Sequence, residues 1–325
     1  MLNSVNLLIV GVVEGITEFL PISSTGHLIV TADLMHFKSS KLFEILIQLG
    51  GVLAVLVFYS KDLLGQARHI TTSRDTQRFW LTILVAALPA GVLALLLKNT
   101  IEAHFFNATV VAVSLIIGGV VMLVVERLPH RQTTHEATKV TLRQAVTVGL
   151  FQVFPLIPGV SRSASTIVGG LLSGMGRSAA TGFSFYLSIP VLGAASLLSL
   201  VKDLQGTGPQ EATTIFVGLG VAFGVALLSI GWFLKFIARH NFQGFALYRI
   251  FAGAAILLLV HSGSSPTHRD EAQGHPRKPG MWAEVPDDGE RFPGCVSGSP
   301  WMPQPDCDTT RTGFTLFDAP QKDRV

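Results

Sequence analysis

Two carboxylates lie close together near the start of the chain, inside a segment that is otherwise apolar. Glu14 and Glu18 are four residues apart, so a helix would place both on one face. Two such charges at membrane depth are costly unless one carboxyl holds a proton or a divalent cation lies between them. Either arrangement suits catalysis. The structural alternative is an amphipathic surface helix with both glutamates in headgroup water.

A hydroxyl-rich segment follows Pro21, the residue that interrupts this apolar run. It consists of Ser23, Ser24, Thr25, Gly26 and His27. Hydroxyls and free backbone amides at a helix start can bind phosphate. Simple N-capping also explains the hydroxyls, and a lone histidine is often a packed core residue. The two nearby glutamates favour a functional site.

A second polar segment interrupts another apolar region and contains one arginine. Its residues are Pro158, Gly159, Val160, Ser161, Arg162 and Ser163. A guanidinium binds phosphate through two parallel N–H donors, and a glycine lets the backbone approach a ligand. Arg162 could also pair with a glutamate of the first segment, and the two roles are compatible.

Two broken helical segments must position these residues. Residues 2–36 are interrupted at 21–24, and residues 142–176 are interrupted at 155–159. Backbone amides freed at membrane depth persist only where protein buries them or a watery cavity receives them. We therefore predict two re-entrant helical hairpins whose breaks meet at a site.

Most of the remaining chain is apolar. Hydrophobic residues make up 49% of the sequence and charged residues 14%, against about 25% charged in soluble domains. Six apolar runs approach the length of a membrane span, at residues 45–60, 79–97, 106–125, 183–201, 213–234 and 244–261. The predicted fold is an all-α polytopic membrane protein with six transmembrane helices plus two re-entrant hairpins. Paired glycines such as Gly50 and Gly51 predict close helix packing.

Loop charges predict the topology. Residues 61–78 and 126–143 each carry four Lys or Arg, which favours a cytoplasmic location for both loops. Counting crossings from these loops, the first hairpin enters from the outer side and the second from the cytoplasmic side. The second copy is then inverted, and the chain is predicted to be an inverted-topology repeat with halves at about 1–125 and 142–261.

Composition separates a membrane domain, residues 1–261, from a hydrophilic tail, residues 262–325, that we expect to be disordered and on the outer side. Both cysteines lie in the tail, so the membrane domain can form no disulfide. The N-terminal run lacks the features of a cleaved signal peptide. No basic stretch with interleaved aromatic residues is present, so nucleic-acid binding is not expected.

Residues 14–28 and 158–163, with supporting stretches at 43–50 and 183–185, resemble the undecaprenyl-pyrophosphate phosphatase family of the bacitracin-resistance type. The resemblance extends over essentially residues 1–261. It implies a bacterial inner-membrane hydrolase, multi-pass, with its active site open to the periplasmic side. Such an enzyme converts undecaprenyl pyrophosphate to the monophosphate carrier lipid, which supports peptidoglycan synthesis. It also confers bacitracin resistance, because bacitracin competes for the same lipid.

The resemblance also implies roles for residues at matching positions. Glu14 and Glu18 would form the acidic pair that holds Mg²⁺ or Ca²⁺, and Ser24 or His27 would be the nucleophile or the acid–base group. Thr25 lies beside them, and Arg162 with Ser161 and Ser163 would bind the pyrophosphate. Val160 and Ala164 stand where the family usually has Thr and Gly, and neither difference removes a charged group.

Two other functions are consistent with the same pattern. Inverted repeats whose broken helices meet at charged residues are typical of transporters, so a polyprenyl-phosphate lipid transporter or flippase is the alternative. A flippase needs no positioned nucleophile, and the hydroxyls and the imidazole therefore favour the enzyme. A membrane subunit with a purely structural role is the other alternative. The oligomeric state, for example a homodimer, is left open.

Overall fold

The computed structural model describes residues 4–35, 41–105, 107–129, 131–203 and 209–262. Every named element in these residues is helical, as predicted, and only one isolated β-bridge joins Thr134 to Met175. The α-helices are α1 (Ser4–Thr17), α2 (Ser24–Leu34), α3 (Lys41–Phe58), α4 (Ser60–His69), α5 (Arg74–His104), α6 (Ala108–Arg127), α7 (Leu142–Phe151), α8 (Arg162–Leu172), α9 (Arg177–Asp203), α10 (Pro209–Ile237) and α11 (Gln243–His261). Two short 3-10 helices are η1 (Ala137–Lys139) and η2 (Phe154–Leu156).

Five helical stretches are long and apolar enough to cross a membrane: Arg74–Leu97, Ala108–Arg127, Arg177–Leu198, Phe216–Ile237 and Gln243–His261. They correspond to five of the six predicted spans. The sixth, predicted at 45–60, lies in α3 up to Phe58, where the helix ends and the chain bends by 70° into α4. The count reaches six only if this bent pair forms one span.

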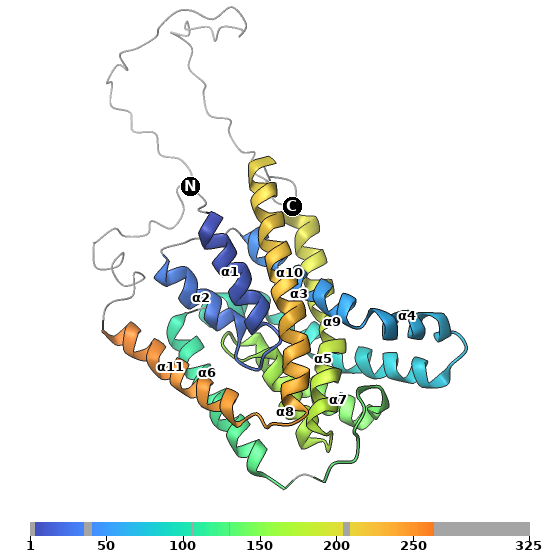
Figure 1. Ribbon diagram of the computed structural model, residues 1–325. Helices are drawn as coiled ribbons and strands as arrows, with labels where there is room; N and C mark the ends of the chain where they lie inside the picture. The colour runs from blue at the N-terminus through green and yellow to red at the C-terminus, as the bar shows by residue number, and fades with distance from the viewer. Residues whose placement is uncertain (1–3, 36–40, 106, 130, 204–208, 263–325) are drawn as a thin grey trace, which may run out of the picture. The chain divides into compact units, whose positions relative to one another are not determined.

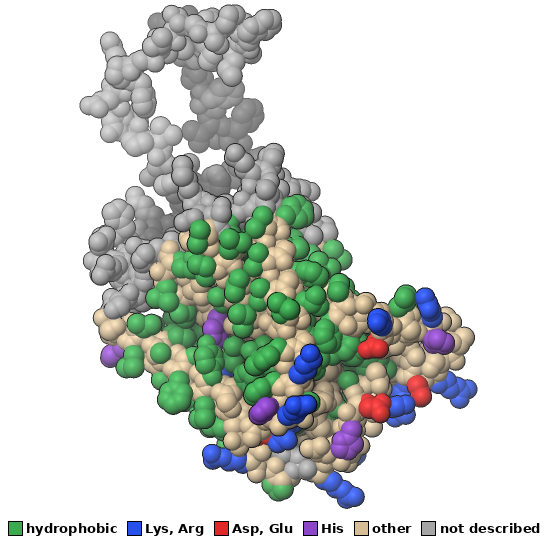
Figure 2. All heavy atoms as spheres, viewed as in Figure 1, with side chains coloured by type: hydrophobic (Ala, Val, Ile, Leu, Met, Phe, Trp, Pro, Cys, Tyr) green, Lys and Arg blue, Asp and Glu red, His purple; other side chains and the backbone are tan. Residues whose placement is uncertain are grey.

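Side chains on the outside of the helices are largely hydrophobic. Leu95 is 81% exposed and Leu228 76% exposed, values that favour lipid as the surrounding solvent. Figure 2 shows hydrophobic side chains over much of one face, while Lys and Arg gather at its lower end and around α4 and the start of α5. The chain is therefore a multi-pass membrane protein.

Both predicted breaks are present. The first lies between α1 and α2, where Ser23 has a φ of 74°, and the second lies between α7 and α8, where Gly159 has a φ of +89°. Helix α1 has 14 residues and is therefore about 21 Å long, well short of the ~30 Å hydrocarbon core.

Small residues bring the helices into close contact. Helix α10 lies against both α1 and α3, and α11 lies against α6 (Figure 1). A Cβ on Gly50 would lie 2.7 Å from the carbonyl oxygen of Leu219, and one on Gly119 would lie 2.7 Å from that of Ala246. The predicted role of the paired glycines in helix packing is confirmed.

The predicted tail begins where α11 ends. His261 is the last residue of this helix, and residues 263–325 lie outside the described residues. The disorder and location predicted for the tail therefore stay predictions, as does the domain boundary.

Candidate active site

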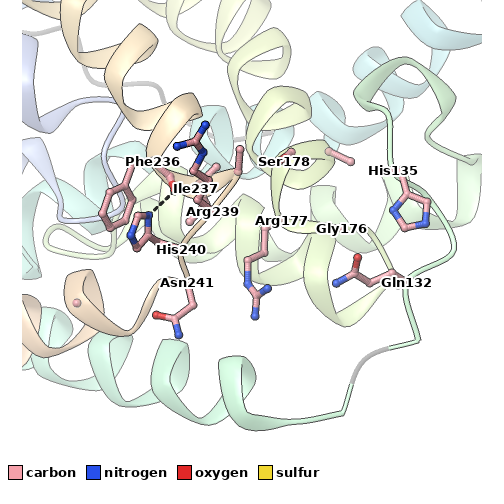
Figure 3. Close-up of a pocket in the computed structure, with 13 residues that line it drawn as sticks. Gln132, His135, Gly176, Arg177, Ser178, Phe236, Ile237, Arg239, His240 and Asn241 are labelled. Atoms are coloured by element: carbon pink, nitrogen blue, oxygen red, sulfur yellow. Dashed lines mark hydrogen bonds between the residues drawn. The ribbon is translucent and has the colours of Figure 1, made fainter.

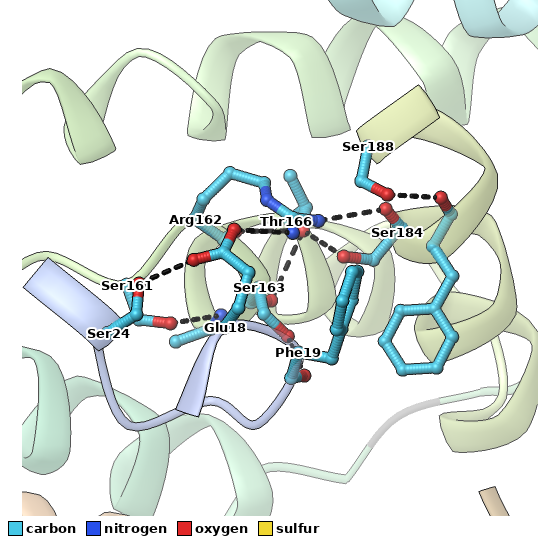
Figure 4. Close-up of polar contacts among 11 residues, drawn as sticks. Glu18, Phe19, Ser24, Ser161, Arg162, Ser163, Thr166, Ser184 and Ser188 are labelled. Atoms are coloured by element: carbon cyan, nitrogen blue, oxygen red, sulfur yellow. Dashed lines mark hydrogen bonds and ion pairs between the residues drawn. The ribbon is translucent and has the colours of Figure 1, made fainter. Parts of the chain in front are cut away.

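Glu18 is the centre of a buried polar cluster that joins the two broken segments (Figure 4). One of its carboxylate oxygens accepts a hydrogen bond from Arg162 Nη2 at 3.2 Å, and the other accepts one from the hydroxyl of Ser24. The Glu18 and Arg162 side chains are only 6% and 10% exposed. Ser24 begins α2 and Arg162 begins α8. Two predicted site residues therefore converge on the carboxylate of a third, and the predicted pairing of Arg162 with a glutamate is confirmed.

Arg162 is held from three directions. Besides Glu18, its guanidinium donates through Nη1 to the carbonyl oxygen of Ser184 in α9 at 3.1 Å. It also lies over the ring of Phe19, 5.6 Å from the ring centroid. Its Nε is buried and has no hydrogen-bond partner among the described residues. A buried donor without an acceptor is costly, so the cluster has unused capacity to bind an anion.

The hydroxyls next to Arg162 hold the second break in place. Ser163 is fully buried and donates to the carbonyl oxygen of Phe19 at 2.8 Å. Ser161 is the N-cap of α8 and accepts from the amide of Ala164 at 3.2 Å. Both residues therefore have structural partners at the positions where the sequence predicts phosphate binding. Their role toward a substrate stays a prediction.

Gly159 lies against the backbone of α6. Its φ of +89° and a Cβ that would fall 2.6 Å from the carbonyl oxygen of Val111 leave room for no other residue type. Its own carbonyl oxygen accepts a hydrogen bond from Arg249. Close helix contact thus explains this glycine without a ligand, and its predicted role in substrate binding is not tested.

Glu14, one helical turn before Glu18, is 2% exposed, and its Oε2 is buried without a hydrogen-bond partner among the described residues. A cation or a proton would relieve this unpaired carboxylate oxygen. The described residues hold no group of three or more His, Cys, Asp or Glu that could bind a metal by itself. Mg²⁺, however, commonly takes one or two carboxylates together with substrate phosphate oxygens. The donor set therefore fits the predicted metal.

His27 lies beside this cluster and faces α11. Its Nδ1 is 2.7 Å from the carbonyl oxygen of Ser23, and its Nε2 is 2.6 Å from the hydroxyl of Tyr248. The two rings are stacked with centroids 5.6 Å apart. In the described part of the chain, both ring nitrogens are thus bonded to residues other than Glu18 and Arg162. Thr25 is exposed.

Arg249 was not predicted as a site residue. Its side chain is fully buried, and it donates to the carbonyl oxygens of Pro21 at 3.2 Å, Gly159 at 3.2 Å and Ser114 at 3.4 Å. It therefore links both breaks to α6. The signal in the sequence was a single charge within the apolar run 244–261, because an ionisable residue at membrane depth marks function by default.

A separate cavity of about 580 Å³ lies away from this cluster (Figure 3). It is lined by Gln132, His135, Gly176, Arg177, Ser178, Ala179, Phe236, Ile237, Ala238, Arg239, His240, Asn241 and Gly244. Its Arg177 donates through Nε to the buried carboxylate of Glu126 at 2.7 Å. No residue of the Glu18 cluster lines it, so the candidate site is identified by its buried polar contacts.

Taken together, the helices and the cluster define a class: multi-pass membrane proteins with an acid–arginine–serine site where two broken segments meet. Within that class, the family model described as "Bacitracin resistance protein BacA" matches residues 7–255, and the chain belongs to this family. The resemblance stated from the motifs is thereby confirmed.

The matches to curated relatives extend over nearly the whole length of each relative. A protein of Deinococcus radiodurans named undecaprenyl-diphosphatase is 45% identical over 261 residues, which are 79% of this chain and 95% of the relative. One of Deinococcus deserti with the same name is 46% identical over 262 residues, with the same two coverages. One of Nitrosospira multiformis, also so named, is 43% identical over 258 residues, 79% of this chain and 94% of the relative.

Proposed function

We propose that this protein hydrolyses undecaprenyl pyrophosphate to undecaprenyl phosphate and inorganic phosphate. Family membership and the shared name of its relatives support this activity. The observation that carries it is the convergence of Ser24 and Arg162 on Glu18, because it unites a nucleophile, a base and a phosphate-binding cation. A flippase needs no such arrangement, and the transporter alternative is not favoured.

The Ser24 hydroxyl already donates to the Glu18 carboxylate, the geometry needed for a general base. In the proposed reaction the Ser24 oxygen attacks the terminal phosphorus in line and its proton passes to Glu18. The P–O bond of the anhydride breaks, and undecaprenyl phosphate leaves. A water molecule then cleaves the phosphoserine and releases inorganic phosphate. Direct attack by water, or by His27, uses the same phosphate position.

Arg162 would bind the pyrophosphate by exchanging partners. Its Nη2 would pass from the Glu18 carboxylate to a phosphate oxygen, and the buried Nε would gain its first acceptor. The contact of Nη1 with the Ser184 carbonyl oxygen would hold the guanidinium in the same orientation. Binding would also free Glu18 to accept the proton of Ser24.

Glu14 and Glu18 are the residues that would hold Mg²⁺ or Ca²⁺. The bound cation would neutralise charge on the phosphate oxygens. Glu14 supports this assignment best, since its Oε2 is buried and unpaired in the described chain.

The finer architecture is part of the proposal: an inverted-topology repeat whose α1–α2 and α7–α8 segments are re-entrant. In such a repeat α1 corresponds to α7, α3 to α9, α5 to α10 and α6 to α11. The contact of α1 with α10 then has a counterpart in the contact of α7 with α5, and α6 meets its own counterpart α11. These contacts support the repeat, and the lengths of α1 and α7, 14 and 10 residues, support re-entrance.

Loop charges and the resemblance support a bacterial inner-membrane location with the site open to the periplasmic side. Its substrate would then reach the site from the outer leaflet, with the isoprenoid chain remaining in lipid. Bacitracin would compete for the same pyrophosphate. A homodimer is compatible with these features, and no step of the proposed reaction requires one.

The test is phosphate release from a C55 or C15 prenyl pyrophosphate by the purified protein in detergent. Glu18→Gln, Ser24→Ala and Arg162→Ala should each lower kcat by about 10²-fold or more, because each removes a group that acts in the transition state. Glu136→Gln, in an exposed loop, is the matched control and should keep the wild-type rate.

A folded wild-type protein that releases no phosphate would overturn the proposal in favour of transport. Wild-type turnover in Arg162→Ala would remove Arg162 from phosphate binding and leave the activity in place.

A further inference from the structure

Two consecutive residues of α11 contact the first break and the helix that follows it. Tyr248 is bonded to His27, and Arg249 to the carbonyl oxygens of Pro21 and Gly159. We propose that Tyr248 and Arg249, here called the α11 clamp, are positioning residues for the proposed hydrolysis. They would orient His27 and hold the two breaks at the spacing that lets Arg162 meet Glu18. This inference rests on the proposed function.

The carbonyl oxygen of Ser23 determines which nitrogen of His27 carries the proton, and Tyr248 bonds the other nitrogen. The Nδ1 atom lies 2.7 Å from the carbonyl oxygen of Ser23, which can only accept, so Nδ1 must be protonated. In the neutral ring Nε2 is then an acceptor, and the Tyr248 hydroxyl, 2.6 Å away, donates to it. The stacked rings fix the plane of the imidazole as well. His27 therefore has one defined tautomer and orientation.

Arg249 links the two breaks across a long stretch of sequence. Pro21 lies in the first break, three residues before Ser24, and Gly159 lies in the second, three residues before Arg162. One guanidinium donates to the carbonyl oxygens of both, and also to that of Ser114 in α6. Backbone carbonyls left free at a helix break need such a donor at membrane depth. Movement of Arg249 would therefore shift both Ser24 and Arg162.

The charge of Arg249 is also unusual. Every hydrogen bond described for its side chain goes to a backbone carbonyl, none to a carboxylate, and its Nε has no partner in the described chain. The buried positive charge is therefore balanced only by dipoles. A pyrophosphate arriving at the neighbouring breaks would add negative charge where it is favoured.

Gly118 provides the space that Arg249 needs. A Cβ at this position would lie 2.2 Å from Arg249 Nη2, a separation that no side chain tolerates. Lysine has no second terminal nitrogen, so a Gly118→Ala change should matter only while arginine is present. This makes Gly118 an independent way to displace the guanidinium without removing its charge.

The first experiment compares Tyr248→Phe with Tyr59→Phe. The Tyr248 change keeps the stacked ring and removes only the hydroxyl that bonds His27, so kcat should fall about tenfold with KM nearly unchanged. Tyr59 packs against Tyr186, and no contact described for it involves a residue of the Glu18 cluster. The kcat of Tyr59→Phe should therefore match that of the wild type. Equal kcat in Tyr248→Phe and wild type would overturn the role of Tyr248.

The second experiment is a double-mutant cycle of Arg249→Lys and Gly118→Ala. Each single change should lower kcat by roughly 10²-fold through displacement of the breaks, with little change in KM, and should lower the thermal midpoint by several degrees. Adding Gly118→Ala to Arg249→Lys should cost little more. Additive losses would mean that Gly118 acts on helix packing alone and would overturn the coupling.

If Arg249→Lys shows no thermal transition, it is unfolded and its kcat carries no information. The kcat values of Gly118→Ala and Tyr248→Phe then test the α11 clamp. Wild-type kcat in both of those folded variants would then overturn the clamp. A wild type that releases no phosphate contradicts the proposed function, whereas variants as active as an active wild type contradict only the clamp.

Discussion

At the residue scale, Glu14 and Glu18 differ in their partners and therefore in their proposed tasks. Glu18 accepts hydrogen bonds from Arg162 and Ser24 on its two oxygens. Glu14 is as buried, yet its Oε2 has no partner within the described residues. The Glu18 carboxylate loses its ion pair with Arg162 only if the substrate draws the guanidinium away from it. Glu14 needs no such exchange, and it is the carboxylate best placed to hold a cation from the start.

The metal prediction belongs to this scale. After treatment with EDTA, phosphate release should fall and return on addition of Mg²⁺ or Ca²⁺. In Glu14→Gln the cation concentration for half-maximal rate should rise about tenfold or more, because one of two anionic ligands is lost. The rate is measured over a cation titration, with Glu136→Gln as the control. An EDTA-treated wild type with full activity would contradict the assignment.

At the element scale, the breaks in the helices matter more than the helices themselves. Serine at the N-cap of α8 starts a new helix directly after Gly159, so Arg162 projects from a helix N-terminus inside the bundle. Ser163 then bonds the backbone of the first segment at Phe19. Each helix of the two broken segments is too short to span a membrane alone, and each segment supplies part of the cluster. The site exists because the two halves are bonded to each other.

Close packing of α3 on α10 yields a stability prediction. Gly50→Ala should lower stability by about 1–3 kcal/mol, because the new methyl group would overlap the Leu219 carbonyl oxygen, 2.7 Å from the built Cβ. The thermal midpoint in detergent should drop by several degrees. Gly220→Ala is the matched control on α10, where a Cβ has nothing within 4 Å. Equal midpoints for the two variants would contradict the close contact.

At the scale of the whole molecule, contacts between distant helices set the geometry. Helix α11 lies along α6, and α10 lies against α1 and α3, so the last described helices support the first break. The exposed apolar side chains around these helices require a lipid environment. Helix α4 differs, since none of its residues is buried and it bends away from α3 by 70°.

The predicted topology can be tested with single cysteines. Both natural cysteines lie in the tail, so a chain ending at residue 262 is cysteine-free and should keep its phosphate release. In intact spheroplasts a membrane-impermeant maleimide should label Thr100→Cys, near the end of α5 and across the predicted span from the basic loop 61–78, and spare Gln132→Cys, in the basic loop predicted inside. Both positions are exposed. The reverse labelling pattern would contradict the predicted orientation.

Local patterns in the sequence specify the helical class, the positions of both breaks and the residues Glu18, Ser24 and Arg162 that form the cluster. These features follow from local patterns: apolar runs make helices in lipid, prolines and glycines interrupt them, and polar residues at membrane depth need one another. The paired glycines were likewise a local signal. The contact of Arg162 with Glu18, 144 residues apart, was one of two compatible predictions, and the structure contains it.

Contacts between distant helices could be learned only from the folded chain. It bonds His27 to Tyr248, 221 residues away, and Arg249 to Pro21, 228 residues away. It also bends the chain by 70° between α3 and α4, at the end of the span predicted at 45–60. Such outcomes depend on which helices pack together, and composition does not specify this, because any apolar helix can meet any other in lipid. The partners of a buried arginine are set by where the free carbonyls of the breaks come to lie.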